Sequence, residues 1–117
     1  MQKIRWGLVS TARINRRLIP AIRTSKRGEL TAVASRDKEK SQAYANEWSI
    51  PHAFGSYEEM LASDGIDAVY ISLPNHLHAE WTIKAMQAGK HVLCEKPLTM
   101  NVAEAQELVD LAASKGI

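Results

Sequence analysis

An acidic and a basic residue, Glu95 and Lys96, follow directly on the apolar stretch 91–94, and Pro97 comes next. Apolar strands usually end in turn residues such as Gly, Asn or Asp. This one ends in opposite charges beside a proline that restricts the backbone. Ligands of an open α/β sheet bind outside the carboxyl ends of its strands. The position therefore predicts that Lys96 is held at the mouth of a crevice, with an ordinary salt-bridged strand end as the alternative.

A second candidate site is the run of residues from 10 to 15, which follows the first apolar stretch of the chain. By position it fills the slots of the G-x-G-x-x-G turn of dinucleotide-binding folds, although it contains no glycine. Ser10 and Ala12 are small enough to let a pyrophosphate approach the backbone. The free amides of the helix that follows, together with Arg13, attract phosphate. We interpret the run as a cofactor-binding turn, with a plain strand-to-helix turn as the alternative; its candidate residues are Ser10, Thr11, Ala12, Arg13 and Ile14.

The end of the second expected strand indicates which dinucleotide would bind. An acid about twenty residues past the turn would bind the ribose 2′-hydroxyl of NAD, but Ser35 and Arg36 stand there. A hydroxyl and a planar guanidinium suit a 2′-phosphate, and Lys38 or Lys40 could add a second positive charge. The pattern predicts NADP over NAD. In the alternative, Arg36 is a solvated loop residue and Asp37 only caps a helix.

A third strand end carries polar residues on the same expected sheet edge, in the segment 73–78. His76 and His78 lie two residues apart, but two histidines without nearby cysteine or a carboxylate cluster make a poor zinc site. We therefore expect no metal, and we expect contact with a cofactor or helix capping instead. The candidate cofactor contacts are Leu73, Pro74, Asn75 and His78.

The elements that position these residues alternate between strand-like and helix-like apolar spacing. Pro20 should kink the first helix or shift its start, and Ser56 with Glu59 forms a capping box. This alternation predicts right-handed βαβ units and a parallel sheet. Strands are expected at 4–9, 29–35, 67–72 and 91–94, with an edge strand within 50–55, and helices at 13–26, from 37 through 48, from 57, over 79–86 and from 101 to 115.

Length and composition indicate one soluble globular domain spanning residues 1–117. The single cysteine, Cys94, argues against a disulfide framework and a metal cluster and favours a reducing, cytoplasmic location. No apolar run is long enough for a membrane span. Basic residues crowd the first third of the chain, but without interleaved aromatic residues or a docking motif, nucleic-acid binding is the least favoured interpretation.

The segments 68–78 and 88–98 together resemble the glucose–fructose oxidoreductase / inositol 2-dehydrogenase (Gfo/Idh/MocA) family. The A-G-K-H-V-x-x-E-K-P pattern, at its distance from P-N-x-x-H, carries the resemblance, which covers essentially the whole chain. It implies the N-terminal nucleotide-binding domain, a three-layer αβα Rossmann fold with a parallel sheet. It also implies NAD(P)-dependent oxidation of a sugar, polyol or related alcohol, or the reverse reduction. The family's C-terminal substrate domain, with its usual catalytic histidine, is expected to be absent from this chain.

The resemblance also implies roles for single residues. Lys96 would be catalytic, beside the nicotinamide and the reacting hydroxyl, where a cationic donor polarises a carbonyl or stabilises a developing alkoxide. Glu95 would define the nicotinamide pocket, and Pro97 would be cis and aim Lys96. His78 would line the site near the nicotinamide ribose. The chain departs from the family's glycine fingerprint at Ser10 and Ala12.

These observations predict the nucleotide-binding domain of an NADP-preferring oxidoreductase, which alone would bind NADP (or NAD) with little or no turnover. The expected partners are the nicotinamide dinucleotide and, in a full-length enzyme, a sugar or polyol. The alternative is a catalytically inactive module that binds NAD(P) or a protein partner. An unfinished sheet edge could then also support a homo-oligomer.

Overall fold

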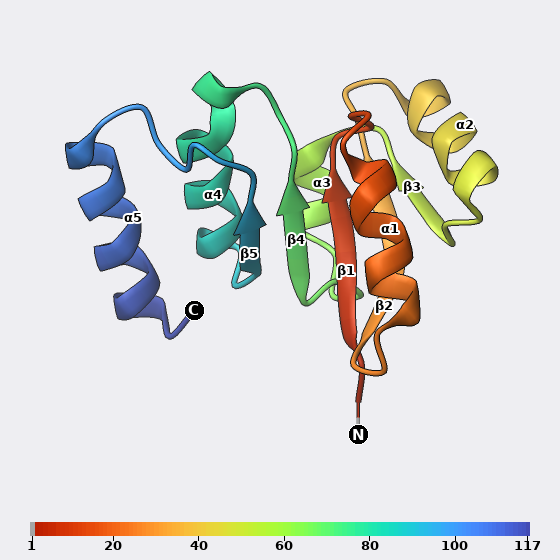
Figure 1. Cartoon of the computed structure of the whole chain (residues 1–117), viewed down its shortest axis with the longest axis horizontal. Helices are drawn as coiled ribbons and strands as arrows, with labels where there is room; N and C mark the ends of the chain where they lie inside the picture. The colour runs from red at the N-terminus through yellow and green to blue at the C-terminus, as the bar shows by residue number, and fades with distance from the viewer. Residues whose placement is uncertain (1) are drawn as a thin grey trace.

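In a computed structural model that describes residues 2–117, strands alternate with helices along the whole chain (Figure 1). The predicted α/β fold is confirmed. The elements are β1 (Ile4–Val9), α1 (Asn15–Thr24), β2 (Gly28–Ala34), α2 (Lys38–Trp48), β3 (His52–Phe54), α3 (Tyr57–Leu61), β4 (Ala68–Ile71), the 3-10 helix η1 (Asn75–Leu77), α4 (His78–Gln87), β5 (His91–Cys94) and α5 (Val102–Lys115).

The five strands form one parallel sheet in the order β3-β2-β1-β4-β5. The chain therefore starts in the middle of the sheet, builds outward to β3, and then crosses back to β4 on the other side of β1. This reversal of strand order is the topological switch point at which doubly wound sheets bind ligands. The carboxyl ends of β1, β4 and β5 point to the top of Figure 1, so the turns that carry the candidate residues share one edge.

Apolar side chains that alternate along the strands supply both faces of the sheet. Leu8 packs against α1 and α2, whereas its neighbour Val9 packs on the opposite face with residues of α3 and α4. Both are fully buried, and each such side chain contributes about 2 kcal/mol to folding. The first cluster contains Leu8, Ile19, Ile22, Leu30, Val33, Ala45, Ile50 and Tyr70, and the second contains Val9, Ala34, Met60, Leu61, Val69, Ile71, Trp81 and Ala85 among others.

Helix starts follow the polar residues that the sequence offers as caps. The side chains of Asp37, Ser56 and Asn101 accept hydrogen bonds from backbone amides two or three residues later, as expected of N-caps. The first helix is shorter than predicted, because the residues before Asn15 form a tight turn in which the Asn15 amide donates to Ala12 O. Helix α1 nevertheless runs through Pro20.

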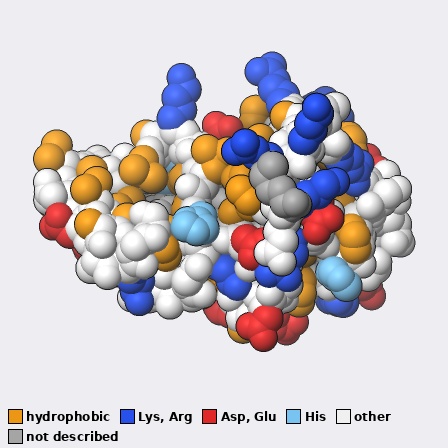
Figure 2. All heavy atoms as spheres, turned by 90° about the horizontal axis from the view of Figure 1, so that it is seen from below, with side chains coloured by type: hydrophobic (Ala, Val, Ile, Leu, Met, Phe, Trp, Pro, Cys, Tyr) orange, Lys and Arg blue, Asp and Glu red, His pale blue; other side chains and the backbone are white. Residues whose placement is uncertain are grey.

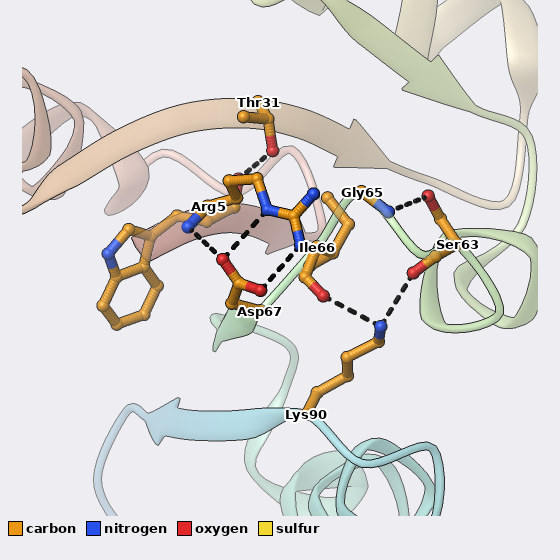
Figure 3. Close-up of polar contacts among 8 residues, drawn as sticks. Arg5, Thr31, Ser63, Gly65, Ile66, Asp67 and Lys90 are labelled. Atoms are coloured by element: carbon orange, nitrogen blue, oxygen red, sulfur yellow. Dashed lines mark hydrogen bonds and ion pairs between the residues drawn. The ribbon is translucent and has the colours of Figure 1, made fainter. Parts of the chain in front are cut away.

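Polar contacts join neighbouring segments at the amino-terminal edge of the sheet (Figure 3). The Arg5 guanidinium donates to both oxygens of Asp67, at 3.0 and 2.8 Å, and the Arg5 amide donates to the same carboxylate. Nearby, the buried Lys90 ammonium donates to the carbonyl oxygens of Ser63 and Ile66 at 2.7 and 2.8 Å. These contacts tie β1, β4 and the start of β5 together at their base.

Strand β5 forms one edge of the sheet, and α5 packs beside α4. Figure 2 shows hydrophobic side chains gathered on the side of the molecule where α5 lies, away from the Lys and Arg side chains around the N-terminus. Large exposed hydrophobic residues of this region are Leu93, Leu98, Met100, Val102 and Val109. Within residues 2–117, no helix combines the length and apolarity needed to cross a membrane.

Candidate functional site

A cavity of about 930 Å³ opens at the carboxyl edge of the sheet, over the switch point. It is lined by the turns that follow β1, β2 and β4 and by the β3–α3 connection. The structure thus brings together eight of the residues predicted from sequence, namely Ser10, Thr11, Ala12, Ser35, Arg36, Lys40, Leu73 and Pro74. The other predicted residues, Arg13, Ile14, Asn75, His78, Glu95, Lys96 and Pro97, do not line this cavity.

The turn after β1 takes a backbone conformation that normally calls for glycine. Ser10 has a φ of 119°, which costs a residue with a β-carbon about 1–3 kcal/mol. The Ser10 amide donates to Ala34 O and the Ala12 amide to Ser10 Oγ. Within the described part of the chain, the amides of Thr11, Arg13 and Ile14 have no acceptor. Three free amides before a helix, on a turn that lines the cavity, suit a phosphate group.

Buried side chains hold this turn to the end of β4. The Asn15 side-chain amide donates to Ser10 O at 2.9 Å, and Ser72 Oγ donates to Asn15 Oδ1 at 2.7 Å. The hydroxyls of Ser10 and Ser72 lie 2.7 Å apart. Asn15 is fully buried, and both serines are 8 % exposed. The contacts bridge β1 and β4 across the switch point, and sequence reasoning missed Ser72.

The segment after β2 presents two cations, Arg36 and Lys40, to the cavity, whereas its serine bonds within the loop. Ser35 Oγ donates to Asp37 O at 2.6 Å and accepts from the Asp37 amide at 3.1 Å, so the hydroxyl shapes the loop. Arg36, at the tip of that loop, is exposed, lines the cavity and makes no ion pair within residues 2–117. Lys40 also lines the cavity, whereas Lys38 Nζ donates to Ala53 O. Of the two predicted lysines, only Lys40 therefore faces the site.

The Glu95-Lys96-Pro97 segment follows β5. Residues of the neighbouring strand β4 form hydrogen bonds with Glu95. The Tyr70 hydroxyl donates a hydrogen bond to Glu95 Oε1, and the Glu95 amide donates to Ile71 O at 3.0 Å. Burial, followed by the hydrogen bond to Glu95, raises the pKa of Tyr70 well above its ordinary range. The Lys96–Pro97 peptide bond is cis, as the resemblance implies. Lys96 itself is exposed and has no hydrogen bond or ion pair with any described residue.

His78 lies beneath this segment and not in the cavity wall. Its side chain is 1 % exposed, with Nδ1 2.6 Å from Pro97 O and Nε2 2.7 Å from Leu73 O. The ring thus joins the loop after β4 to the loop after β5. Of the two histidines in the segment 73–78, it is His76 that lines the cavity. Direct contact of His78 with a nicotinamide ribose stays a prediction.

Several lining residues were not predicted from sequence. They lie mainly in the β3–α3 connection, where Tyr57 packs edge-on against Trp81 with ring centroids 5.0 Å apart. The sequence predicts the edge strand and a helix start at Ser56, but no local pattern places them at the same sheet edge as the turn after β1. The unpredicted lining residues are Asp37, Gly55, Ser56, Tyr57, Glu58, Ser72, Leu77 and Trp81. Among residues 2–117, no three His, Cys, Asp or Glu side chains gather in a way that could hold a metal ion.

Residues 4–117 match a protein family described as an oxidoreductase family with an NAD-binding Rossmann fold, Gfo/Idh/MocA. The chain is 47 % identical over 113 residues to D-xylose 1-dehydrogenase (NADP(+)) 2 of Haloferax volcanii, covering 96 % of this chain and 34 % of the relative. It is 40 % identical over 114 residues to scyllo-inositol 2-dehydrogenase (NADP(+)) IolU of Bacillus subtilis, covering 97 % of this chain and 35 % of that enzyme. The chain thus spans about a third of the length of these curated relatives.

Comparison with solved structures supports the same family and the same fold. The 3-ketoreductase KijD10 from Actinomadura kijaniata, in complex with TDP-benzene and NADP, superposes with a TM-score of 0.94 at 38 % identity. That match covers 99 % of this chain and 37 % of the ketoreductase. The predicted family and fold are both confirmed by these comparisons. With its parallel sheet, its switch-point cavity and its match over residues 4–117, the chain belongs to the Gfo/Idh/MocA oxidoreductase family, as its NAD-binding Rossmann domain.

Proposed function

We propose that this chain binds NADP in preference to NAD. It is the nucleotide-binding domain of an oxidoreductase that acts on a sugar, a polyol or a related alcohol or carbonyl compound. The observation that carries the preference is Arg36, an exposed guanidinium on the cavity wall at the end of β2 that has no ion-pair partner among residues 2–117. A carboxylate at this place would bind the ribose 2′-hydroxyl of NAD, whereas arginine accommodates a 2′-phosphate. The relatives named as NADP(+)-dependent and the neighbour with bound NADP support the same preference.

Residues of the chain suit the two phosphate-bearing parts of NADP, the pyrophosphate and the 2′-phosphate. The free amides of Thr11, Arg13 and Ile14 suit the pyrophosphate, because helix-start amides and the helix dipole attract phosphate. Arg36 and Lys40 supply positive charge for the 2′-phosphate. NADP supplies or accepts a hydride at its nicotinamide ring. On this proposal, the turn after β1 and the loop after β2 fix the cofactor before any chemistry begins.

Lys96 is the proposed catalytic residue of the chain. The Glu95–Tyr70 hydrogen bond and the His78–Pro97 contact hold the loop on both sides of Lys96, while the ammonium group stays exposed. A cation in that position stabilises negative charge that develops on a substrate oxygen. It can also take part in proton transfer to or from that oxygen.

The decisive experiment is a titration of wild type and Arg36→Ala with NADPH and NADH, followed by nicotinamide fluorescence. Wild type is expected to bind NADPH more tightly, and the variant is expected to lose about tenfold in NADPH affinity with little change for NADH. Arg27→Ala is the matched control, because Arg27 is also an exposed arginine but lies at the opposite edge of the sheet. Equal affinity of wild type for the two nucleotides would overturn the NADP preference.

A further inference from the structure

We infer that Ser72 and Asn15 are positioning residues for the cofactor pyrophosphate, because they hold the glycine-free turn in the shape that glycine would otherwise provide. The inference rests on the proposed function, since it concerns how the same turn binds a dinucleotide. It assigns roles to two buried residues that do not themselves supply the phosphate-binding amides.

The conformation of Ser10 creates the need for such a support. Its φ of 119° lies in the region that residues with a β-carbon rarely adopt. Glycine reaches this region without strain, but serine keeps it only where the surroundings enforce it. The surroundings here are the side chains of Asn15 and Ser72, which contact the carbonyl and the hydroxyl of Ser10 respectively.

The donors and acceptors of these contacts can be placed without ambiguity. Ser10 O only accepts, so the Asn15 amide nitrogen faces it and Asn15 Oδ1 faces Ser72. The Ser72 hydroxyl proton is then used on Asn15, which leaves Ser72 Oγ to accept from the Ser10 hydroxyl. Ser10 Oγ in turn accepts from the Ala12 amide at 3.1 Å. The result is a closed, directional ring of hydrogen bonds between the end of β1 and the end of β4.

The ring decides which amides remain for a ligand. It satisfies the Ala12 amide internally and leaves those of Thr11, Arg13 and Ile14 without acceptors in the described residues. Because a buried polar ring with one member removed leaves its neighbours unsatisfied, loss of Ser72 should relax Ser10 and move those three amides. The loop that carries Arg36 makes none of these contacts, so the 2′-phosphate site should be unaffected.

A comparison of two ligands separates this role from a general structural one. NADPH contains the pyrophosphate, whereas adenosine 2′-monophosphate keeps the 2′-phosphate but lacks it. Ser72→Ala is expected to raise the Kd for NADPH about tenfold and the Kd for adenosine 2′-monophosphate by less than about twofold. The matched control is Ser41→Ala, which removes another buried serine hydroxyl, bonded to Val33 O at 3.1 Å and not part of the ring.

A second set of variants tests whether the hydrogen-bond ring offsets the backbone strain at Ser10. This test does not require that Ser72→Ala folds. Both Ser10→Ala and Ser10→Gly remove the hydroxyl, but only glycine removes the strain. We therefore expect Ser10→Gly to bind NADPH within about threefold of wild type and Ser10→Ala to bind at least about tenfold more weakly. In the Ser10→Gly background, adding Ser72→Ala should cost little, because the ring is no longer needed.

Equal effects of Ser10→Ala and Ser10→Gly would overturn the inference, as would equal weakening of both ligands by Ser72→Ala. Wild type that binds NADPH while Ser72→Ala behaves like Ser41→Ala would overturn the inference alone. Wild type that fails to bind NADPH would overturn the proposed function, and the inference with it. Selective loss of NADPH binding in Ser72→Ala, relieved by glycine at position 10, would establish the positioning role.

Discussion

The phenolic hydroxyl of Tyr70, on β4, donates a hydrogen bond to the carboxylate of Glu95, the first residue after β5. Tyr70 is 3 % exposed and belongs to the cluster under α1 and α2. The contact fixes the residue immediately before Lys96 to the sheet, so the exposed lysine extends from an anchored backbone.

The Tyr70–Glu95 contact predicts a specific loss of stability at alkaline pH. The pKa of Tyr70 is raised in the folded state above its ordinary value of 10.0. The unfolded chain therefore loses this proton first, and stability should fall as pH rises above about 10. In Tyr70→Phe this part of the decline is absent, so the difference between the variant and wild type in unfolding free energy shrinks with rising pH. Denaturant titrations from pH 8 upward measure it, and parallel curves for the two proteins would contradict it.

The Arg5–Asp67 pair predicts a loss of stability at acidic pH. Hydrogen bonds from Arg5 lower the pKa of Asp67 from 3.8 to about 2 (Figure 3). The contribution is therefore complete above about pH 4 and is lost as pH falls toward 2. Asp67→Asn should flatten this part of the acid unfolding curve, measured by circular dichroism. Glu80→Gln, which breaks the exposed pair with Lys84 on α4, is the control and should leave the curve unchanged.

His78 is predicted to be structural in a way that its neighbour His76 is not. His78→Leu removes the contacts of both ring nitrogens and leaves the carbonyls of Leu73 and Pro97 without this partner, so the unfolding free energy should drop by roughly 2 kcal/mol. His76→Ala, at an exposed position in the cavity wall, should change stability little. Urea unfolding of both variants checks this, and equal loss in the two would show that the His78 contacts contribute nothing of their own.

Lys40 and Lys38 are predicted to behave differently toward NADPH. Lys40 lines the cavity, so Lys40→Ala should weaken NADPH binding about threefold, with an effect that fades at high salt. The ammonium of Lys38 is bonded to Ala53 O, so Lys38→Ala should leave the NADPH Kd nearly unchanged. Fluorescence titrations at two salt concentrations compare them. A larger effect of Lys38→Ala would place the second cation of the site at residue 38.

Most of the fold could be predicted because local signals agreed with one another. Short apolar runs around Leu8, Val33 and Val69 indicated the three central strands. The N-cap residues Asp37, Ser56 and Asn101 indicated where helices start. The sequence pattern does not fix the sheet order by itself. The order of β3, β2, β1, β4 and β5 depends on packing across the whole domain.

The candidate site was predicted unevenly, for a physical reason. Arg36 and Pro74 lie just after the carboxyl ends of strands. The parallel sheet brings these strand ends to one edge, so the positions of such residues follow from the strand pattern. The use of Ser35 within its own loop, of Lys38 on Ala53 and of His78 between two carbonyls depends on side-chain distances. Such distances between segments remote in sequence are not encoded in any local pattern, and Ser72 was missed for that reason.

The ring of Ser10, Asn15 and Ser72 has a consequence for how such domains diverge. On the positioning role inferred for Ser72, a serine at position 10 requires a hydroxyl at position 72, whereas a glycine at position 10 does not. Substitutions at the two positions are therefore not independent, and an evolutionary path between the two kinds of turn must pass through glycine at position 10 before Ser72 is free to change. Natural relatives should accordingly show correlated residues at these positions, and a search that requires glycine in the turn would miss chains that carry serine there, as this one does.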